Sequence, residues 1–470
     1  MFLVIALPRI TGPIADSDEG INAAVWGFDA RSLRELGIAD SRFGGVRLDG
    51  SLYASHPPAI VAGTAVSELV LGEHPWSTRL PAWLASLASI PLLYALVRSL
   101  RLDPVLAAAA TVAALGCHML MVYGSMLDTM VVAFPLGLAV ALVWHRQWTG
   151  AASPPWWAVF GLGTIASLAS WQATFLVGLC AVATAGRFRS DRRAVLRALP
   201  YGVAVVVATA ISLGWALWTY ETFEVLGDKL TRRTSGEAAT VGSMITFQIP
   251  WLAQLLGLGF LACIACLVSL RDRRYRPLAA LSLVAVFGYA VILKEGAGGH
   301  QFWNYWAMLP AAIGIAYVLE AIGRAVAPSA RSGSGARNAV LVGAAVLVVV
   351  VNLTRPNQAG ELIESGYVPY ELVRSAELAP GQTELPYLAE PHRPDDWLRY
   401  NELPLGAPLL DEDALRTLAR DHPDHLVLVL GTCAAPDPTA ICEQLTFAGT
   451  DETSVPPRLV RASELAAQLP

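Results

Sequence analysis

The stretch RLPAWLASLASIPLLYALVR, residues 79–98, places eighteen consecutive uncharged residues between two arginines. A run of this length can cross the roughly 30 Å hydrocarbon core of a bilayer as one helix. The whole 470-residue chain has the same character, since 54% of its residues are hydrophobic, only 15% are charged and the mean hydropathy is +0.49. A soluble domain carries about 25% charged residues. The sequence therefore predicts an integral membrane protein.

The net charge of the chain is -5, and no basic stripe interleaved with aromatic residues is present. These features give no indication of nucleic-acid binding.

Ten apolar runs of about 17 to 25 residues predict membrane-spanning helices. Alternate junctions between these runs are rich in arginine, and the positive-inside rule places such junctions in the cytoplasm. The remaining junctions, the segment before the first run and the tail after Arg355 are then extracytoplasmic. The predicted spans begin near Leu80, Pro104, Met126, Trp156, Trp171, Leu199, Pro250, Pro277, Phe302 and Ala339.

The segment Met1–Ile10 is apolar but too short to span a bilayer. It also lacks the ordered basic, apolar and small-residue regions of a cleavable signal peptide. We interpret it as a truncated first span, which brings the expected total to eleven.

Two domains are expected along the chain. Residues 1–353 form a helical membrane domain with a long outer loop over residues 11–79, and residues 354–470 form a small soluble domain. In that tail, Asp411–Asp421 has the pattern of an amphipathic helix and His425–Gly431 that of a buried strand. The predicted fold class is thus an all-α polytopic membrane protein, with about ten or eleven transmembrane helices and an extracytoplasmic α/β domain at the C-terminus.

The cysteines divide in the same way. Those at 117, 180, 263 and 266 lie in apolar runs, where a small buried hydrophobe is the expected role. Cys433 and Cys442 lie in the tail, where an oxidising compartment would allow them to form a disulfide.

Acidic residues cluster just after the short apolar N-terminus, at Asp16, Asp18 and Glu19. One interpretation is a solvated loop. However, the helical periodicity that follows places the cluster near a helix start. A carboxylate held at a membrane surface could serve as a general base or could bind a cation.

Further along the same outer loop lie His56-Pro57-Pro58 and Arg79. The two prolines fix the backbone around His56, which is consistent either with a rigid turn or with a positioned functional histidine. Arg79 immediately precedes a span, so it could snorkel to the lipid headgroups or bind a phosphate through paired hydrogen bonds.

Two later outer segments also carry ionisable residues. Asp128 lies at the start of a span, where it is either a helix cap or a functional acid. Lys294 and His300 lie among aromatic residues between two spans, where they could form part of an interfacial belt or add positive charge to a phosphate site.

Taken in order, these motifs resemble the GT-C glycosyltransferases of the protein O-mannosyltransferase and aminoarabinose transferase (ArnT-like) type. The resemblance covers about Ile14 to Gly323, and the common outward side of the motifs is its most specific feature. The motifs are Asp18-Glu19, His56-Pro57-Pro58, Arg79-Leu80-Pro81, Met126-Leu127-Asp128 and the late His300-x-Phe-Trp-x-Tyr-Trp run.

The resemblance implies a GT-C fold and an enzyme that transfers one sugar from a polyprenyl-phosphate donor to an extracytoplasmic protein, lipid or cell-wall glycan, with inversion. In this family an acid of the first outer loop is the catalytic base, which corresponds to Asp18, with Glu19 as its motif partner. Arg79, His56, Lys294 and His300 would hold the donor phosphate, because a lipid phosphate leaving group needs cations more than it needs an acid. Asp16 and Asp128 would position the acceptor or an ion. No cofactor is required, although a divalent metal is compatible with the acids.

Two other classes of function remain open from the sequence. A transporter or flippase of polyprenyl-linked glycans would also have many spans, but it would need ionisable residues along a path through the membrane. Only Asp128 and Glu320, both near span ends, approach that description. A noncatalytic cell-envelope assembly protein is the second alternative, and a degenerate acidic loop would have favoured it.

Overall fold

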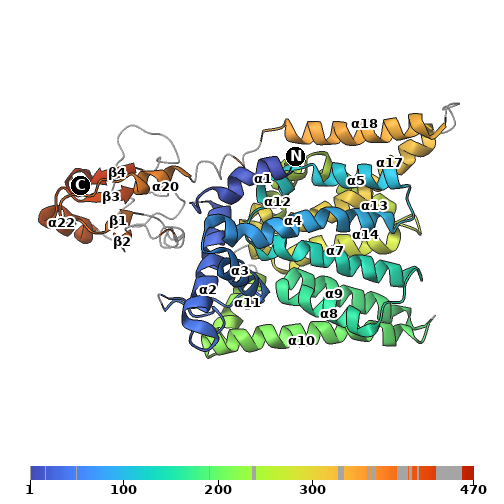
Figure 1. The fold of residues 1–470 in the computed structure, drawn as a ribbon, viewed down its shortest axis with the longest axis horizontal. Helices are drawn as coiled ribbons and strands as arrows, with labels where there is room; N and C mark the ends of the chain where they lie inside the picture. Colours follow the sequence, from blue (N-terminus) through green and yellow to red (C-terminus); the bar gives the residue numbers. More distant parts are fainter. Residues whose placement is uncertain are drawn as a thin grey trace. The chain divides into compact units, whose positions relative to one another are not determined.

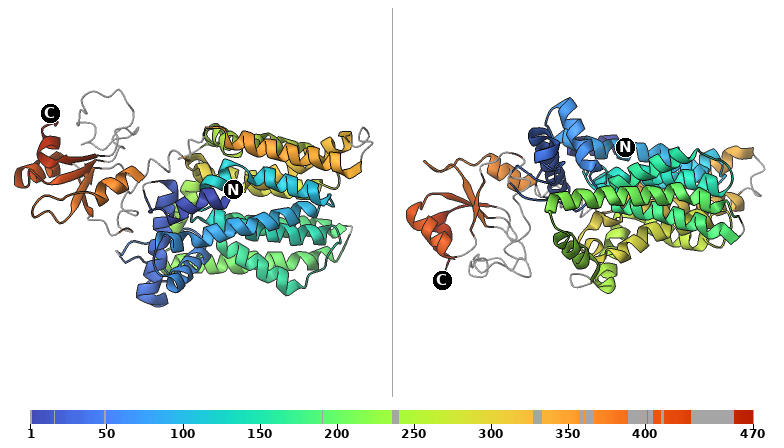
Figure 2. Two further views of the ribbon diagram at one scale, coloured as in Figure 1. Left: turned by 45° about the horizontal axis from the view of Figure 1, so that its top comes forward. Right: turned by 90° about the horizontal axis from the view of Figure 1, so that it is seen from below.

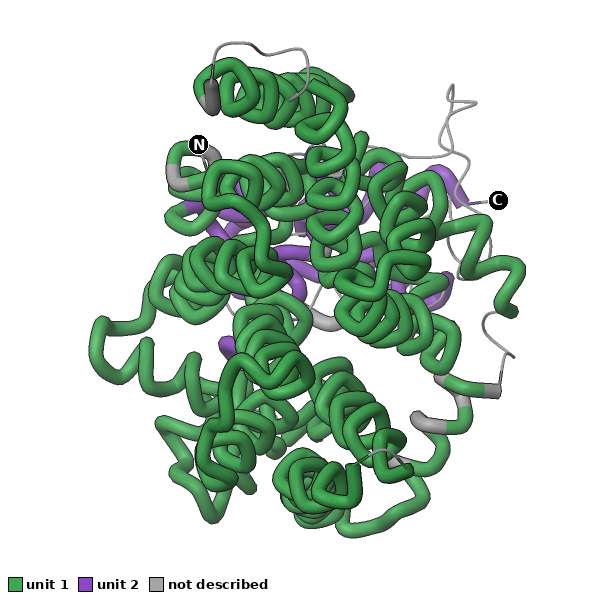
Figure 3. Tube along the Cα trace, turned by 90° about the vertical axis from the view of Figure 1, so that its right-hand side faces the viewer, with its two compact units in different colours: residues 1–11, 29–359 green, residues 12–28, 360–470 purple. Residues whose placement is uncertain are grey.

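The computed structural model describes residues 2–15, 17–48, 50–189, 191–235, 240–326, 333–356, 360, 367–388, 401, 405–409, 412–429 and 458–469. The chain forms two compact units, shown in Figure 3. The helical unit contains Met1–Thr11 and Asp29–Ala359, and the sheet unit contains Gly12–Phe28 and Gly360–Pro470. Residues 12–28, which the sequence places in the outer loop of the membrane domain, thus group with the C-terminal residues. Each unit is described on its own.

The helical unit consists almost entirely of helices, as the sequence predicts. Three short irregular helices, η1 (Gly186–Arg189), the π-helix η2 (Val284–Gly288) and η3 (Gln301–Ala307), interrupt the α-helices. Helix α2 (Asp18–Asp40) enters this unit at Asp29. The other α-helices are α1 (Phe2–Thr11), α3 (Ala59–Leu71), α4 (Pro75–Arg98), α5 (Pro104–Leu115), α6 (His118–Tyr123), α7 (Thr129–Trp148), α8 (Trp156–Ala169), α9 (Trp171–Ala185), α10 (Ala194–Tyr220), α11 (Glu224–Ser235), α12 (Val241–Leu256), α13 (Leu258–Ser269), α14 (Arg276–Leu283), α15 (Tyr289–Ile292), α16 (Lys294–Gly299), α17 (Met308–Val326) and α18 (Gly333–Leu353).

The long helices of this unit lie side by side and roughly parallel in Figures 1 and 2. Helices α4, α7 and α9 begin at one end of the bundle, where α8 and α10 terminate and where α3 and α11 lie. We call this the site end, and we call the opposite end, with the arginine-rich junctions, the basic end. Close packing needs small residues: a Cβ on Gly314 of α17 would lie 1.8 Å from the carbonyl oxygen of Ala262 in α13.

Each of the ten predicted spans coincides with a helix or with two or three consecutive helices. Within the described residues, five helices are long and apolar enough to cross a membrane, and six if the bent pair α12–α13 counts as one span. Other predicted spans, such as Pro104–Leu115 and Trp156–Ala169, coincide with shorter apolar helices. The chain is a multi-pass membrane protein, while ten or eleven crossings remain a prediction.

The predicted outer loop is more regular than expected, because residues 18–40 and 59–71 form α2 and α3. The periodicity that predicted a helix after Gly20 is confirmed. Helix α3 was missed because its apolar segment of thirteen residues is too short to be recognised as a membrane span.

A buried asparagine stabilises the break between α12 and α13, which are bent by 108°. Asn352 of α18 is 1% exposed, and its Oδ1 accepts a hydrogen bond of 2.8 Å from the backbone N–H of Leu258. Its Nδ2 donates to the carbonyl oxygen of Gly116, which lies between α5 and α6, over 3.1 Å. Gly257 has φ +58°, and a Cβ there would lie 2.2 Å from Asn352 Oδ1. One side chain therefore satisfies backbone groups at two helix breaks.

The sheet unit contains a four-stranded sheet of order β2-β1-β3-β4. Strand β1 is parallel to β2 and β3, and β3 is antiparallel to β4. The predicted helix and buried strand in the tail are confirmed as α22 and β3, and Leu415 of α22 packs with Val427 and Val429 of β3 in a small core. Cys433 and Cys442 lie outside the described residues, so their disulfide stays a prediction. The elements are β1 (Leu385–Leu388), β2 (Leu405–Pro408), β3 (Leu426–Val429), β4 (Arg458–Arg461), α20 (Tyr367–Arg374), α22 (Glu412–Asp421) and α24 (Ala462–Ala466).

Replacing Asn352 by alanine should destabilise the helical unit, because buried backbone groups at both breaks lose their partner. We expect a loss of about 1–3 kcal/mol, measured as a lower thermal unfolding midpoint in detergent by tryptophan fluorescence. Val346→Ala is the control, since Val346 lies on the same helix with 53% of its side chain exposed. Equal midpoints for the two variants would contradict the role of Asn352.

Candidate functional site

Three segments that are far apart in the sequence meet at the site end of the bundle. Ser86 of α4 donates a hydrogen bond of 2.6 Å to the carbonyl oxygen of Gly124, and its hydroxyl lies 3.2 Å from that of Tyr305 in η3. Trp306 Nε1 donates to the carbonyl oxygen of Met130 over 2.7 Å. The middle of α4, the first turn of α7 with the turn before it, and η3 are thus tied together by buried polar contacts. These segments carry the predicted residues Arg79, Asp128 and His300.

Asp128 caps the first turn of α7. Its Oδ1 accepts a hydrogen bond of 2.8 Å from the backbone N–H of Met130, and the residue is only 7% exposed. The helix-cap interpretation is therefore confirmed in geometry, and a role toward an acceptor or an ion remains a prediction.

Arg79 is completely buried in the first turns of α4. It lies seven residues before Ser86, so the two side chains share a helix face, separated by about 10 Å along the axis. That face is the one held against the turn before α7. A guanidinium that only snorkels to lipid headgroups would be exposed, so the burial of Arg79 contradicts the snorkelling interpretation.

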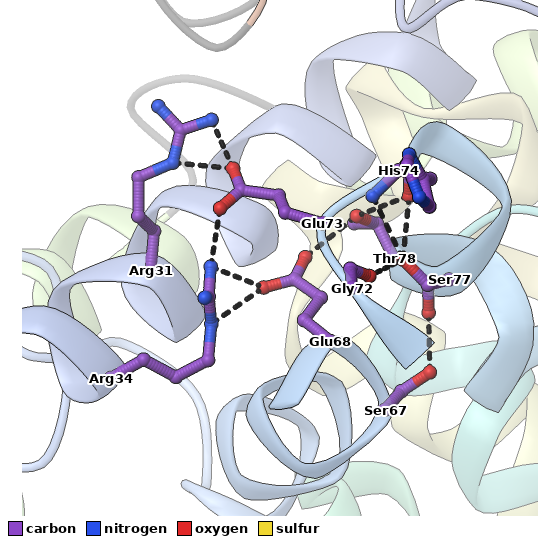
Figure 4. A network of polar contacts seen from close by, with 9 residues as sticks. All are labelled: Arg31, Arg34, Ser67, Glu68, Gly72, Glu73, His74, Ser77 and Thr78. Carbon is purple, nitrogen blue, oxygen red and sulfur yellow. Dashed lines mark hydrogen bonds and ion pairs between the residues drawn. The ribbon is translucent and has the colours of Figure 1, made fainter. Parts of the chain in front are cut away.

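A network of ionic contacts holds the start of α4 in place, as Figure 4 shows. Arg34 of α2 donates to both Glu68 of α3, over 3.2 Å, and Glu73, over 2.5 Å. Arg31 also pairs with Glu73. Thr78, the neighbour of Arg79, donates its hydroxyl hydrogen to Glu68 Oε1 over 2.6 Å.

The two glutamates of this network have opposite pKa shifts. The Glu68 side chain is fully buried, and burial outweighs its contacts with Thr78 and Arg34, so its pKa rises to about 7. Glu73 is partly exposed, and although burial raises its pKa, the contacts with Arg31 and Arg34 together leave the pKa lowered. Glu68 is therefore the member of the network that changes protonation near neutral pH.

A second buried ion pair supports the segment before His56. Arg47 Nε donates to Asp29 Oδ1 over 2.7 Å, and its guanidinium carbon lies 5.2 Å from the centre of the Tyr53 ring. The Tyr53 and His56 rings are 6.4 Å apart, and His56 is half-buried. The prolines after His56 lead directly into α3. His56 thus occupies a fixed position, as the prolines predict.

An apolar groove of about 650 Å³ opens between α9, α10 and α15. Its walls include Phe175, Leu213 and Ile292, and it ends at Ser55 and Leu293, the neighbours of His56 and Lys294. Trp171 Nε1 donates to the carbonyl oxygen of Ser55 over 3.1 Å, which fixes that end. Tyr220 accepts a hydrogen bond of 2.8 Å from the backbone N–H of Ala54.

Stacked rings connect this groove to His300. Tyr289, in the groove wall, stacks on Trp303 with ring centres 5.9 Å apart, and the exposed His300 ring lies 6.3 Å from Trp303. Gln248 of α12 donates to the carbonyl oxygen of His300 over 2.9 Å. Lys294 donates to the carbonyl oxygen of Thr234. His56 and Lys294 thus adjoin groove-lining residues in the sequence, and His300 is connected to the groove through Trp303 and Tyr289.

The acidic cluster belongs to the sheet unit. Asp16 and the side chain of Asp18 lie outside the described residues, while the backbone of Asp18 begins α2. Glu19 is 1% exposed, so the solvated-loop interpretation is wrong for this acid. The turn from Ala15 to Gly20 requires glycine at position 20, because a Cβ there would lie 1.9 Å from the carbonyl oxygen of Ala15. The N–H of Gly20 donates a hydrogen bond of 3.1 Å to Ser17 Oγ.

In the part of the chain that the structure describes, no three His, Cys, Asp or Glu side chains lie close enough together to hold a metal ion. Asp16 and the side chain of Asp18 lie outside those residues. A divalent metal stays a prediction.

Sequence reasoning missed the glutamate network and Gln248. Glu68 had a usable signal, since it is an ionisable residue inside the apolar segment Ala59–Leu71. Gln248 had none, because its importance comes from contacts with residues about fifty positions away.

The sequence matches no known family model and no curated protein. The structure, in contrast, is similar to ArnT from Cupriavidus metallidurans bound to undecaprenyl phosphate, with a TM-score of 0.57 and 16% identity over 91% of this chain and 92% of that one. It is also similar to the archaeal oligosaccharyltransferase AglB from Archaeoglobus fulgidus in complex with an inhibitory peptide and a dolichol-phosphate, with a TM-score of 0.50 and 10% identity over 91% and 69% of the two chains.

Both are membrane glycosyltransferases of the GT-C superfamily. This chain has the GT-C fold. The fold expected from the ordered motifs is therefore confirmed, and the roles of the individual residues stay predictions.

Glu68 should make the stability of the protein depend on pH. Because its pKa is about 7 in the folded state and near 4.5 when unfolded, the folded state retains a proton that the unfolded chain releases. The contribution of Glu68 to the free energy of unfolding is complete below its unfolded pKa of 4.5 and is lost as pH rises through its folded pKa of about 7. We expect Glu68→Gln to flatten the fall in thermal midpoint between pH 5 and pH 8. Glu35→Gln, at an exposed site on α2, should keep the wild-type slope. An unchanged slope in Glu68→Gln would refute the assignment.

Two substitutions of Asp128 distinguish its hydrogen bond as a helix cap from the effect of its negative charge. Asp128→Ala should lower stability by about 0.5–2 kcal/mol, whereas Asp128→Asn should stay near wild type, because asparagine caps a helix as well as aspartate does. Chemical unfolding of both variants in detergent measures this difference. Equal destabilisation would show that the carboxylate charge itself is needed in the folded protein.

Proposed function

We propose that this chain is a membrane glycosyltransferase that transfers a single sugar from a polyprenyl-phosphate donor to an extracytoplasmic acceptor. The observation that carries the proposal is the apolar groove of about 650 Å³, whose lining residues Ser55 and Leu293 adjoin His56 and Lys294 in the sequence. An apolar channel with cationic or protonatable groups at one end suits a lipid chain with a phosphate head. The GT-C fold supports this function, and one similar structure is bound to undecaprenyl phosphate.

In this proposal, the polyprenyl chain occupies the groove along α9 and its phosphate lies at the site end. Lys294 and His300 supply hydrogen-bond donors at the mouth, and His56 approaches from the segment before α3. Arg79 would contribute positive charge from the start of α4. The contacts of Gln248 and of the glutamate network hold the backbone around His300 and Arg79 before the donor binds, which reduces the cost of ordering the site.

The chemistry needs a leaving group and a base. A hydroxyl oxygen of the acceptor attacks the anomeric carbon while the bond from that carbon to the phosphate oxygen breaks, and the polyprenyl phosphate leaves with the electron pair. Cations stabilise the charge that develops on the phosphate. Asp18 accepts the acceptor proton as general base, with Glu19 as its partner. A single displacement inverts the anomeric configuration.

The distribution of arginines indicates on which side of the membrane the acceptor binds. Arginine-rich junctions at the basic end place that end in the cytoplasm by the positive-inside rule, so the site end and the tail face outward. Asp16 and Asp128 are proposed to position the acceptor or an ion. A protein, a lipid and a cell-wall glycan are all compatible acceptors, and a divalent metal would act in addition to these residues.

The direct test is sugar transfer by membranes that contain the protein, supplied with radiolabelled undecaprenyl phosphate sugars and cell-envelope acceptors. Asp18→Asn should lower transfer by at least roughly 10²-fold, the usual contribution of a general base. Lys294→Gln should weaken donor use by raising the donor KM, since it removes a charge at the phosphate.

Asp40→Asn is the matched control, because Asp40 is an exposed acid at the opposite end of α2. It should transfer sugar at the wild-type rate. Undiminished transfer by Asp18→Asn would remove Asp18 from the mechanism, and no transfer from any donor would contradict the glycosyltransferase assignment.

A further inference from the structure

A second apolar groove, of about 350 Å³, lies at the basic end of the helical unit. It is bounded by α7, α9 and α14, with Trp148, Ala183 and Ala280 among its lining residues. Leu179 and Val182 of α9 contribute to this groove and also to the larger one. Helix α9 therefore carries two grooves, one toward each end.

Two arginines lie at the smaller groove. Arg276, at the start of α14, is part of its wall, and its Nε donates to the carbonyl oxygen of Leu270 over 2.8 Å. The guanidinium carbon of Arg187 lies 4.5 Å from the centre of the Trp148 ring, and Arg187 donates to the Trp148 carbonyl oxygen over 2.9 Å. Both arginine side chains are exposed. The groove thus combines an apolar wall with two accessible positive charges.

The surrounding junctions add to this positive charge. Ten arginines lie at position 146 and within residues 187–197 and 271–276, against two acids, Asp191 and Asp272. Of these, Arg274 pairs with Glu320, and Asp191 pairs with Arg197. The local excess of cations favours an anionic partner, and its attraction to anionic lipid is additive over the arginines near the surface.

The charge distribution also decides between two lipid classes. A polyprenyl phosphate has one charged end, and the proposed function places that end at the other end of α9. The fifteen residues of α9 span about 22 Å, and the smaller groove is lined on this helix only by residues of its second half, Leu179, Val182 and Ala183. A lipid that places its charge at Arg276 must therefore belong to the leaflet at the basic end.

We propose that this groove binds an anionic phospholipid of that leaflet, with an acyl chain against Ala183 and Ala280 and the headgroup phosphate at Arg276 and Arg187. The bound lipid would fill the space between α7, α9 and α14 and would hold these helices together at the basic end. This site is independent of the donor site and does not require the proposed enzymatic activity.

The test is native mass spectrometry of the full-length protein in detergent, titrated with phosphatidylglycerol or phosphatidylcholine of the same acyl chains. We expect phosphatidylglycerol to bind more tightly, and Arg276→Gln and Arg187→Gln each to weaken it about 5-fold, or about 30-fold together. The control is Arg273→Gln, an exposed arginine of the same junction that is not among the described residues lining the groove. It should bind phosphatidylglycerol as the wild type does.

A steric variant tests the groove without changing charge. Ala280→Phe should weaken phosphatidylglycerol binding while the arginines remain, and its elution volume and thermal midpoint report whether it is folded. The proposal is overturned by equal binding of the two phospholipids, by equal losses in Arg273→Gln and Arg276→Gln, or by displacement of phosphatidylglycerol with undecaprenyl phosphate. The last result would assign both grooves to one donor chain.

Discussion

A hydrocarbon layer provides no hydrogen-bond partner for a peptide group and no solvation for a charge, and the helical unit is arranged around this constraint. Where a helix breaks, a buried side chain supplies the missing partner. Asn352 does so at the α5–α6 and α12–α13 breaks, and Gln248 does so before η3. Glu68 of α3 is buried in a network that connects α2, α3 and α4, and Arg79 is buried next to Thr78 of that network. The irregular backbone needed for a site is therefore confined to one end, where side chains can satisfy it.

The helices of the membrane part follow closely from the sequence, because long apolar runs have few other stable conformations in a bilayer. Each predicted span matches one or more helices, and the tail helix before His425 and the strand after it are also present.

The site was predicted less completely. His56, Lys294 and His300 could be proposed from motif order, but the groove beside them is made by residues of α9, α10 and α15, whose proximity is a property of packing. Helix α3 and the Glu68 network were missed for a related reason. A short apolar helix gives a weak signal, and the ion pairs of the network join residues 34 to 42 positions apart. The hydrogen bond from Thr78 to Glu68 joins residues ten positions apart. The role of Asp18 rests on family resemblance alone.

Helix α9 contributes to two apolar grooves with different surroundings. At the site end the groove leads to histidines and a lysine near stacked aromatic rings, and at the basic end it leads to arginines near a tryptophan. Both ends combine an apolar wall with a cationic rim, but the fold builds them from different segments. We propose a reacting lipid for the first groove and a structural lipid for the second.

The most direct measurement is a structure of the full-length protein in a lipid nanodisc with undecaprenyl phosphate added, determined by electron cryomicroscopy. The account predicts density for the polyprenyl chain along α9, with its phosphate in contact with Lys294 and His300. Phosphate density at Arg276, or a polyprenyl chain bound outside the groove of α9, α10 and α15, would contradict the assignment of the donor site.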